Sequence, residues 1–258
     1  MTNDVGNKLE GQIAKAAPAE RKTARDLIAT MEGEFARALP ATLKVDRFMR
    51  VAMTEIRQTP ELGTCSGDSL LGALVTAAQL GLEPGGPLGE YYLTPRTLKG
   101  QGKVVVPIIG YQGLLTLARR GGVGQIDARI VREGDRYNEG FDTERGFFAE
   151  WHPQLDDTRT AIGVLAAARL PGGDVQHRYL AIDEVLERKA RGAAGDRGPW
   201  ATDFEAMARK TGLRALAPRL PRSAELAHAV RVDETVQTYR PGVDVLPLGE
   251  LESDEGAG

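Results

Sequence analysis

Arginine and lysine side chains gather in two segments of this chain, where they can bind a polyanion. Residues 91–132 hold seven basic residues and one acidic residue, and residues 188–222 hold nine and three, although the whole chain has a net charge of −3. Basic side chains replace the counterions that surround nucleic acid and so favour its binding. The ordinary alternative for each segment is a solvated face. The candidate phosphate contacts are Arg96, Lys99 and Lys103 in the first segment and Arg188, Arg191, Arg209, Lys210 and Arg214 in the second.

Lys210 and Arg214 are one helical turn apart in a predicted helix, so both are expected to point at one nucleic-acid backbone. Contacts made only to phosphate and sugar do not depend on base sequence. Arg188 and Arg191 flank a glycine-rich segment at 192–198, which we expect to be flexible, and are secondary candidates.

Tyr111 and Gln112 lie between two glycines at the start of another predicted helix. Gly110 and Gly113 would let backbone amides approach a phosphate there, and the ring of Tyr111 could stack on a base. Aromatic residues make up only 5% of the chain, so extensive base stacking is not expected. We interpret Trp200 as a packing anchor.

Asp174, Glu187 and Lys189 offer a different chemistry, because a Mg²⁺-dependent nuclease can use an Asp followed by Glu-x-Lys to hold the metal and polarise water. That use requires Glu187 and Lys189 on a strand, where alternate residues share a face. Residues 183–191 instead have the pattern of a helix, whose outer face would simply be charged. A Mg²⁺-dependent nuclease is therefore the alternative function.

Other catalytic patterns are absent from the sequence. Gly102-Lys103 is followed by Val104, so there is no phosphate-binding loop of the ATPase type. The three histidines are dispersed, and Cys65 is the single cysteine, which excludes an intrachain disulfide and a multi-cysteine zinc site. We expect a binding protein rather than an enzyme, with no cofactor; Mg²⁺ is possible, but no motif requires it.

The apolar stretches are too short for a membrane protein. The longest, 104–109 and 161–168, fall far short of the roughly 20 residues that cross a bilayer. Residues 1–20 include the charged residues Asp4, Lys8, Glu10 and Lys15 and contain no apolar run, so no secretory signal is expected.

Helical periodicity dominates the N-terminal third, after a flexible arm at 1–19. We predict a five-turn helix from residue 20 to Pro40, a second helix from Val45 to Pro60, and a third from a Ser66 cap to Gly81. The apolar stripes of these helices form either a subunit interface or part of the core; they contain Leu27, Met31, Phe35, Phe48 and Met53.

Extended and helical segments alternate in the remainder. Glycines at 100 and 102 predict a hairpin between strands at 88–94 and 104–109, and Pro171-Gly172-Gly173-Asp174 predicts a turn between antiparallel strands at 161–170 and 175–181. Further strands are predicted at 125–132 and 147–151, and helices at 111–120, 183–191 and 200–217. The predicted class is α+β, with a small antiparallel sheet, segregated helices and a helical N-terminal region.

We predict one core over residues 20–230, helical at 20–82 and with sheet and helices at 88–222. An acidic flexible tail is expected at 231–258, because residues 223–258 hold eight acidic residues and two basic ones. The tail would either shield the basic groove, engage a partner or increase solubility.

Several blocks in the same order resemble the RecT family of single-strand annealing proteins of phages and prophages. They span roughly residues 25 to 230. The blocks are Leu80-Gly81-Leu82-Glu83-Pro84, Leu88-Gly89-Glu90-Tyr91-Tyr92-Leu93-Thr94-Pro95, Ile109-Gly110-Tyr111-Gln112-Gly113-Leu114-Leu115, Ile182-Asp183-Glu184-Val185, Pro199-Trp200, Lys210-Thr211 and Leu213-Arg214.

The resemblance implies a DNA recombinase that needs no ATP, binds single-stranded DNA and the annealed duplex, and pairs complementary strands as a homo-oligomer, either a ring or a helical filament. It also implies a basic DNA groove, a 5′-to-3′ exonuclease and the host single-strand-binding protein as partners, and the bacterial cytoplasm as location. A passive DNA-coating protein is a further alternative.

Overall fold

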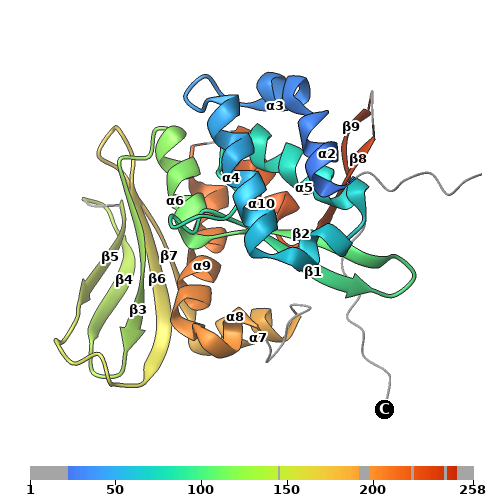
Figure 1. The fold of residues 1–258 in the computed structure, drawn as a ribbon. Helices are drawn as coiled ribbons and strands as arrows, with labels where there is room; N and C mark the ends of the chain where they lie inside the picture. Colours follow the sequence, from blue (N-terminus) through green and yellow to red (C-terminus); the bar gives the residue numbers. More distant parts are fainter. Residues whose placement is uncertain (1–22, 145, 192–197, 222–223, 241–242, 249–258) are drawn as a thin grey trace, which may run out of the picture.

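The computed structural model describes residues 23–144, 146–191, 198–221, 224–240 and 243–248. The predicted arm at 1–19 lies outside these ranges, as does most of the glycine-rich segment at 192–198. The helices and small antiparallel sheets confirm the predicted α+β class (Figure 1). None of the helices in the described ranges is long and apolar enough to span a membrane.

The N-terminal region is helical as predicted, with one difference. The expected five-turn helix is two helices, α2 (Ala24–Ala29) and α3 (Glu32–Ala38), followed by α4 (Val45–Gln58) and the short η1 (Pro60–Thr64). Thr23 begins α2 with a capping box, and the Thr30 hydroxyl donates to the Leu27 carbonyl at its end. Such side-chain bonds to the backbone compete with helix continuation.

The next helix, α5 (Gly67–Leu80), is the centre of the fold and is buried along most of its length. It ends at Gly81, which has a positive φ of 61°, as the sequence predicts. The predicted cap is wrong, because the Ser66 side chain makes no capping hydrogen bond. Gly72 lets another strand pass closely, since a Cβ there would overlap the Gln237 carbonyl.

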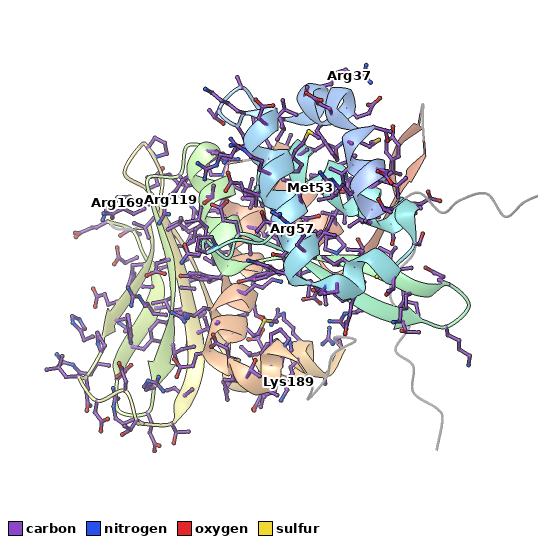
Figure 2. The ribbon with its side chains drawn as sticks, in the orientation of Figure 1. Arg37, Met53, Arg57, Arg119, Arg169 and Lys189 are labelled. Carbon is purple, nitrogen blue, oxygen red and sulfur yellow. The ribbon has the colours of Figure 1, made fainter. Side chains whose placement is uncertain are left out.

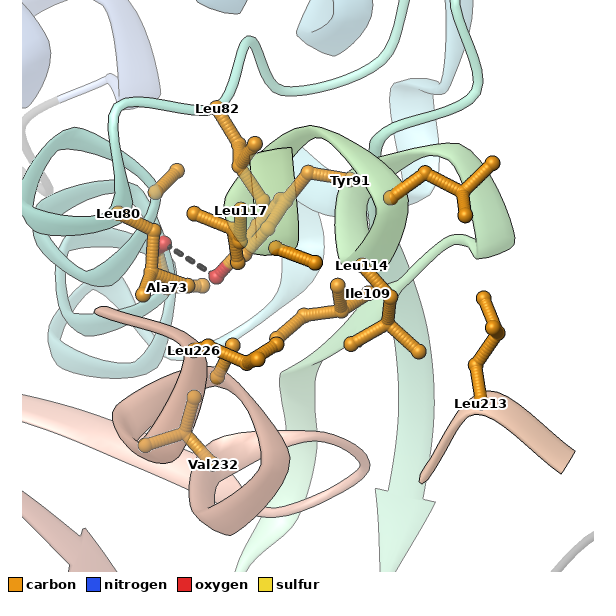
Figure 3. Packing of buried hydrophobic residues seen from close by; sticks show 14 of the residues in the cluster. Ala73, Leu80, Leu82, Tyr91, Ile109, Leu114, Leu117, Leu213, Leu226 and Val232 are labelled. Carbon is orange, nitrogen blue, oxygen red and sulfur yellow. Dashed lines mark hydrogen bonds between the residues drawn. The ribbon is translucent and has the colours of Figure 1, made fainter. Parts of the chain in front are cut away.

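The predicted hairpin is confirmed as β1 (Tyr91–Leu98) and β2 (Gly102–Ile109), paired along their whole length. It projects from the body in Figure 1 and leads into α6 (Tyr111–Arg120), which has the predicted bounds. Figure 3 shows the Tyr91 hydroxyl donating to the Ala73 carbonyl of α5, at 2.7 Å, inside the main core. This bond ties the base of the hairpin to the central helix.

The main sheet has the order β3-β6-β7, with strands Gln125–Arg132, Ala161–Arg169 and Val175–Ala181. A second hairpin, β4 (Arg136–Asp142) and β5 (Gly146–His152), covers one face, where Tyr137 stacks on Tyr179. The sequence analysis missed β4, because its residues are mostly exposed and lack an apolar alternation.

The start of the β4–β5 hairpin is fixed by a buried carboxylate, Asp135. Burial alone would raise its pKa, but backbone N–H groups of Arg132 and Gln154, the Arg159 guanidinium and the Trp151 indole all donate to it. Together they hold the pKa of Asp135 well below its ordinary value.

The other face of the main sheet is covered by helices from the last third of the chain. They are α7 (Ile182–Arg191), α8 (Pro199–Thr202) and α9 (Phe204–Leu216), followed by η2 (Ala217–Arg219). The predicted single helix at 200–217 breaks at Asp203, whose carboxylate caps α9 by accepting from Ala206 N–H. Gly212 lets α9 lie close to Val164 of the sheet.

The prediction of a flexible tail from residue 231 is wrong for the described residues of that segment. Helix α10 (Ala224–Val232) is followed by strands β8 (Val236–Arg240) and β9 (Val243–Leu248). Asp233, Val236 and Gln237 are buried, and β8 packs against α5. The folded core therefore continues past residue 230, and residues 249–258 lie outside the described ranges.

The apolar stripes of the N-terminal helices belong to the core. Ile28, Met31, Phe35 and Phe48 are buried, and Leu27 and Met53 pack against the same cluster. Core packing, rather than a subunit interface, accounts for these residues.

Candidate nucleic-acid interface

A pocket of about 420 Å³ lies among α7, α8, α9 and α10 and brings together basic residues that are distant in sequence. Trp200 and Met207 form part of its apolar lining, and Glu234 adds an acidic group. Trp200 is buried and its ring contacts Phe204, with centroids 5.8 Å apart, as expected for a packing anchor. The basic lining of the pocket consists of Arg188, Arg191, Lys210 and Arg214.

Asp233 is the buried centre of this region, with a fully buried side chain. Its carboxylate accepts from Lys210 Nζ at 2.9 and 3.1 Å and from Arg214 at 3.0 Å. It also accepts from the backbone N–H of Ile109, at 2.8 Å. This one carboxylate therefore joins the end of β2, helix α9 and the segment between α10 and β8.

Lys210 differs from its predicted role. It shares a face of α9 with Arg214, as expected, but only 4% of its side chain is exposed and its ammonium is paired with Asp233. Glu234 lies 3.6 Å from the same ammonium. The prediction of a direct phosphate contact by Lys210 is wrong for this conformation, because a buried charge needs its partner. Arg214, with 35% of its side chain exposed, reaches the pocket surface.

Arg188 and Arg191 lie at the exposed end of α7. Arg188 is near Glu184, with 3.7 Å between the charged groups, and Arg191 pairs with Glu187 at 3.0 Å. Both pairs join residues one turn apart on a solvent-exposed surface, where ion pairs are weak. A phosphate can therefore compete for both arginines.

Tyr111 and Arg209 form a second group, where the start of α6 meets α9. The Arg209 guanidinium carbon lies 5.5 Å from the centre of the Tyr111 ring. The Tyr111 hydroxyl donates to Asp127. Burial and this hydrogen bond raise the pKa of Tyr111, so the phenol is held neutral.

The two glycines beside Tyr111 serve backbone packing rather than an open phosphate site. The N–H of Gly110 donates to the Glu90 carbonyl at 2.9 Å. A Cβ on Gly113 would overlap that same carbonyl. Gln112 is exposed in the first turn of α6.

Arg96, Lys99 and Lys103 form a third group, on the β1–β2 hairpin. Arg96 is opposite Val104, and Lys103 is opposite Thr97, so Arg96 and Lys103 point to opposite faces. Lys99 lies in the turn. Within the described ranges, Arg96 Nε is buried without a hydrogen-bond partner.

The predicted contact residues thus occupy three places: the pocket, the Tyr111–Arg209 contact and the projecting hairpin. No single trough that contains them all is defined by the described residues. Sequence analysis also missed Asp233, because it fell in the predicted tail; the apolar spacing of Leu226, Val230 and Val232 was the available signal for a helix there.

The residues of the nuclease alternative are not brought together as that chemistry requires. Asp174 lies immediately before β7, and α7 begins immediately after β7. The seven residues of this strand therefore separate Asp174 from the start of α7 by roughly 23 Å. Glu187 and Lys189 lie on a helix, not on a strand. The described part of the chain contains no group of three or more His, Cys, Asp or Glu residues that could hold a metal ion.

Comparison with known proteins identifies the family of this chain. The model of the RecT family matches residues 46–245, from α4 to β9. The chain belongs to the RecT family. It is 39% identical to Protein RecT of Escherichia coli (strain K12) over 196 residues, which cover 74% of this chain and 72% of that protein.

RecT-family membership supports DNA binding and a role in recombination by single-strand annealing. The resemblance blocks at 80–84, 88–95 and 109–115 meet in the structure. Pro84 forms a bridge with Tyr91, Tyr91 pairs with Ile109, and the N–H of Gly110 donates to the Glu90 carbonyl. Asp233, whose carboxylate binds Ile109, lies within the family match as well. The match therefore includes the segment that sequence analysis had placed in a tail.

Proposed function

We propose that this protein binds single-stranded DNA and anneals complementary strands without ATP. The observation that carries the proposal is the RecT-family match over residues 46–245. The cationic pocket among α7, α8, α9 and α10 supports it, because guanidinium groups there can bind phosphates.

The residues of the pocket have different roles in this proposal. Arg188, Arg191 and Arg214 contact the DNA backbone, while Lys210 positions Arg214 by holding Asp233 between them. Phosphate contacts carry no direct base information, so any complementary pair of strands is a substrate. The hairpin residues Arg96, Lys99 and Lys103 contact DNA outside the pocket, and Gln112 and the Tyr111–Arg209 pair are further contacts.

The protein acts as a binding protein rather than an enzyme, and no cofactor is part of the proposal. It works as a homo-oligomer, ring or filament, on single strands and on the annealed duplex. A 5′-to-3′ exonuclease that produces single strands and the host single-strand-binding protein are its partners, in the bacterial cytoplasm. RecT-family membership supports the DNA-binding and recombination role on which these proposals rest.

The salt dependence of binding tests the pocket. Each phosphate contact contributes about 0.7 to the slope of log K against log salt for single strands. Replacing Arg188 and Arg191 by Gln should lower that slope by up to about 1.4, equally for different DNA sequences. The matched control replaces Arg25 and Arg37, on α2 and α3, and should leave the slope unchanged. Equal slopes in all three proteins would show that Arg188 and Arg191 do not contact DNA.

Two further assays separate the alternatives. Incubation of labelled DNA with Mg²⁺ should leave it intact; shortening that Glu187→Gln abolishes would favour the nuclease. A passive coating protein would bind both strands and slow their pairing, whereas an annealing protein accelerates it.

A further inference from the structure

Two phenylalanine rings are exposed at the tip of the β4–β5 hairpin. Phe141 and Phe147 are directly paired in the register and are 64% and 75% exposed. Their rings meet edge to face, with centroids 5.1 Å apart. An apolar pair held in one geometry on a projecting hairpin is typical of an interaction site.

The charge around these rings argues against nucleic acid as their partner. Between the two rings the sequence carries two acidic residues, Asp142 and Glu144, and one basic residue, Arg145. Asp142 ends β4 directly beside Phe141, and Glu144 lies in the turn. Carboxylates repel a polyanion, so the rings are suited to a protein surface that is apolar and rimmed with positive charge.

This chain itself carries such a surface. A pocket of about 490 Å³ lies between α4 and the 85–92 segment, with Val51, Pro87 and Tyr92 among its apolar lining. Tyr92 is 45% exposed, and Leu88, next to Pro87, is 55% exposed. Apolar surface therefore extends from the pocket to its rim.

Two arginines provide the positive rim. Arg50 lines the pocket, as does one carboxylate, Glu55. Arg57 is next to the pocket and donates to the hydroxyl of Thr54, which lines it; Arg57 is labelled on α4 in Figure 2. Arg50 donates to the Asp46 carbonyl oxygen at 3.2 Å. Within the described ranges neither arginine forms an ion pair with a carboxylate at 4.0 Å or less, in contrast to Arg47, which is paired with Glu83.

We propose that Phe141 and Phe147 of one copy insert into the α4 pocket of the next copy, with the acidic hairpin facing Arg50 and Arg57. The inference rests on the proposed function, because annealing on a multimer requires a repeated contact between subunits. Because the two rings are 64% and 75% exposed, together they can bury roughly 200–350 Å² more. That is about a quarter to two fifths of the roughly 800 Å² per partner in a standard interface. Because the two surfaces differ, the contact is head to tail and generates a ring or a helical filament.

The test measures the mass distribution of the full chain, with and without single-stranded DNA. A knob variant, Phe141→Ser with Phe147→Ser, and a pocket variant, Arg50→Glu with Arg57→Glu, should each weaken self-association on the order of thirtyfold or more. The control for the knob is Leu155→Ser, which removes another exposed apolar side chain. The control for the pocket is Arg25→Glu with Arg37→Glu, which changes the net charge equally. Both controls should assemble like the unmodified protein.

Mixing the two variants distinguishes a head-to-tail contact from other arrangements. The pocket of the knob variant and the hairpin of the pocket variant are intact, so the mixture should form a heterodimer that cannot grow. A heterodimer also shows that both variants are folded. Absence of the heterodimer, when both variants melt within a few degrees of the unmodified protein, contradicts the inference.

Other outcomes separate this contact from the proposed function. A knob variant that assembles normally, or an unmodified protein that stays monomeric with and without DNA, overturns the contact. Lost DNA binding at unchanged mass would mean that the rings contact bases, which also overturns it. An unmodified protein that assembles as described but does not accelerate annealing contradicts the proposed function and leaves the contact standing.

Discussion

Replacing Asp233 by Asn should destabilise the protein strongly, because it removes the carboxylate that the buried ammonium of Lys210 and the guanidinium of Arg214 share. The Asp233 side chain is fully buried, and Lys210 is 4% exposed, so the ammonium would remain buried without its counter-charge. Breaking a buried pair from one side costs about 3–5 kcal/mol. Arg214 can turn to solvent and Glu234 remains 3.6 Å from Lys210, so we expect the lower end, about 3 kcal/mol.

Urea and thermal unfolding measure this loss. A change of about 3 kcal/mol in the free energy of unfolding should lower the melting temperature by roughly 6–12 °C for a chain of this size. The urea midpoint should fall with little change in the slope m. The control is Glu34→Gln, which removes the exposed pair with Arg37 and should change stability by less than about 0.5 kcal/mol.

A second substitution tests the electrostatic cause. Lys210→Met in the Asp233→Asn background removes the unpaired ammonium while keeping an unbranched apolar side chain, and should restore about 2 kcal/mol of the lost stability. A loss below about 1 kcal/mol for Asp233→Asn, or no recovery on adding Lys210→Met, would refute the reasoning.

Three further substitutions test the packing and the pH dependence of the fold. Gly72→Ala should cost about 3 kcal/mol in urea unfolding, because its Cβ would overlap the Gln237 carbonyl and push β8 from α5; a neutral effect would contradict the close approach. Because the pKa of Asp135 is lowered by folding, its carboxylate contributes stability that is complete above the unfolded pKa of about 3.9 and is lost as the pH falls below it. Asp135→Asn should therefore lower the free energy of unfolding at pH 7 and make it fall less steeply as the pH is lowered. An equally steep fall in acid for both proteins would contradict this. Tyr111→Phe removes the hydrogen bond to Asp127 and should cost about 1 kcal/mol in urea unfolding, and no loss would show that the bond is not stabilising.

Local sequence signals predicted many elements of this fold correctly. The observed bounds of α6, β3 and β7 agree with the predicted bounds. These bounds depend on apolar periodicity and on flanking turn residues, which are both local features of the sequence. The end of α5 at Gly81 follows from the positive φ that glycine adopts easily.

Long-range contacts determine what sequence analysis missed. Strand β4 is mostly exposed and has its register from pairing with β5, so its own pattern carried little signal. Asp233 appeared to belong to an acidic tail, yet it is the counter-charge for Lys210 and Arg214. Counting charges along the chain cannot distinguish a buried ion pair from a cation that is available to DNA.

The candidate site was therefore only partly predictable. The sequence indicated which segments are basic, and the fold brings Arg188, Arg191, Lys210 and Arg214 to one pocket. It could not indicate that Lys210 is buried there, nor that Arg96 and Lys103 point to opposite faces of their hairpin, because both depend on tertiary packing and strand register.

The central claim is most directly tested by mixing complementary labelled oligonucleotides with the full-length protein in the absence of any nucleotide. Fluorescence should show that pairing is faster than the spontaneous reaction, and the Arg188→Gln, Arg191→Gln variant should require less salt than the unmodified protein to lose this acceleration. Pairing no faster than the spontaneous rate, at protein concentrations that saturate the strands, would contradict the account.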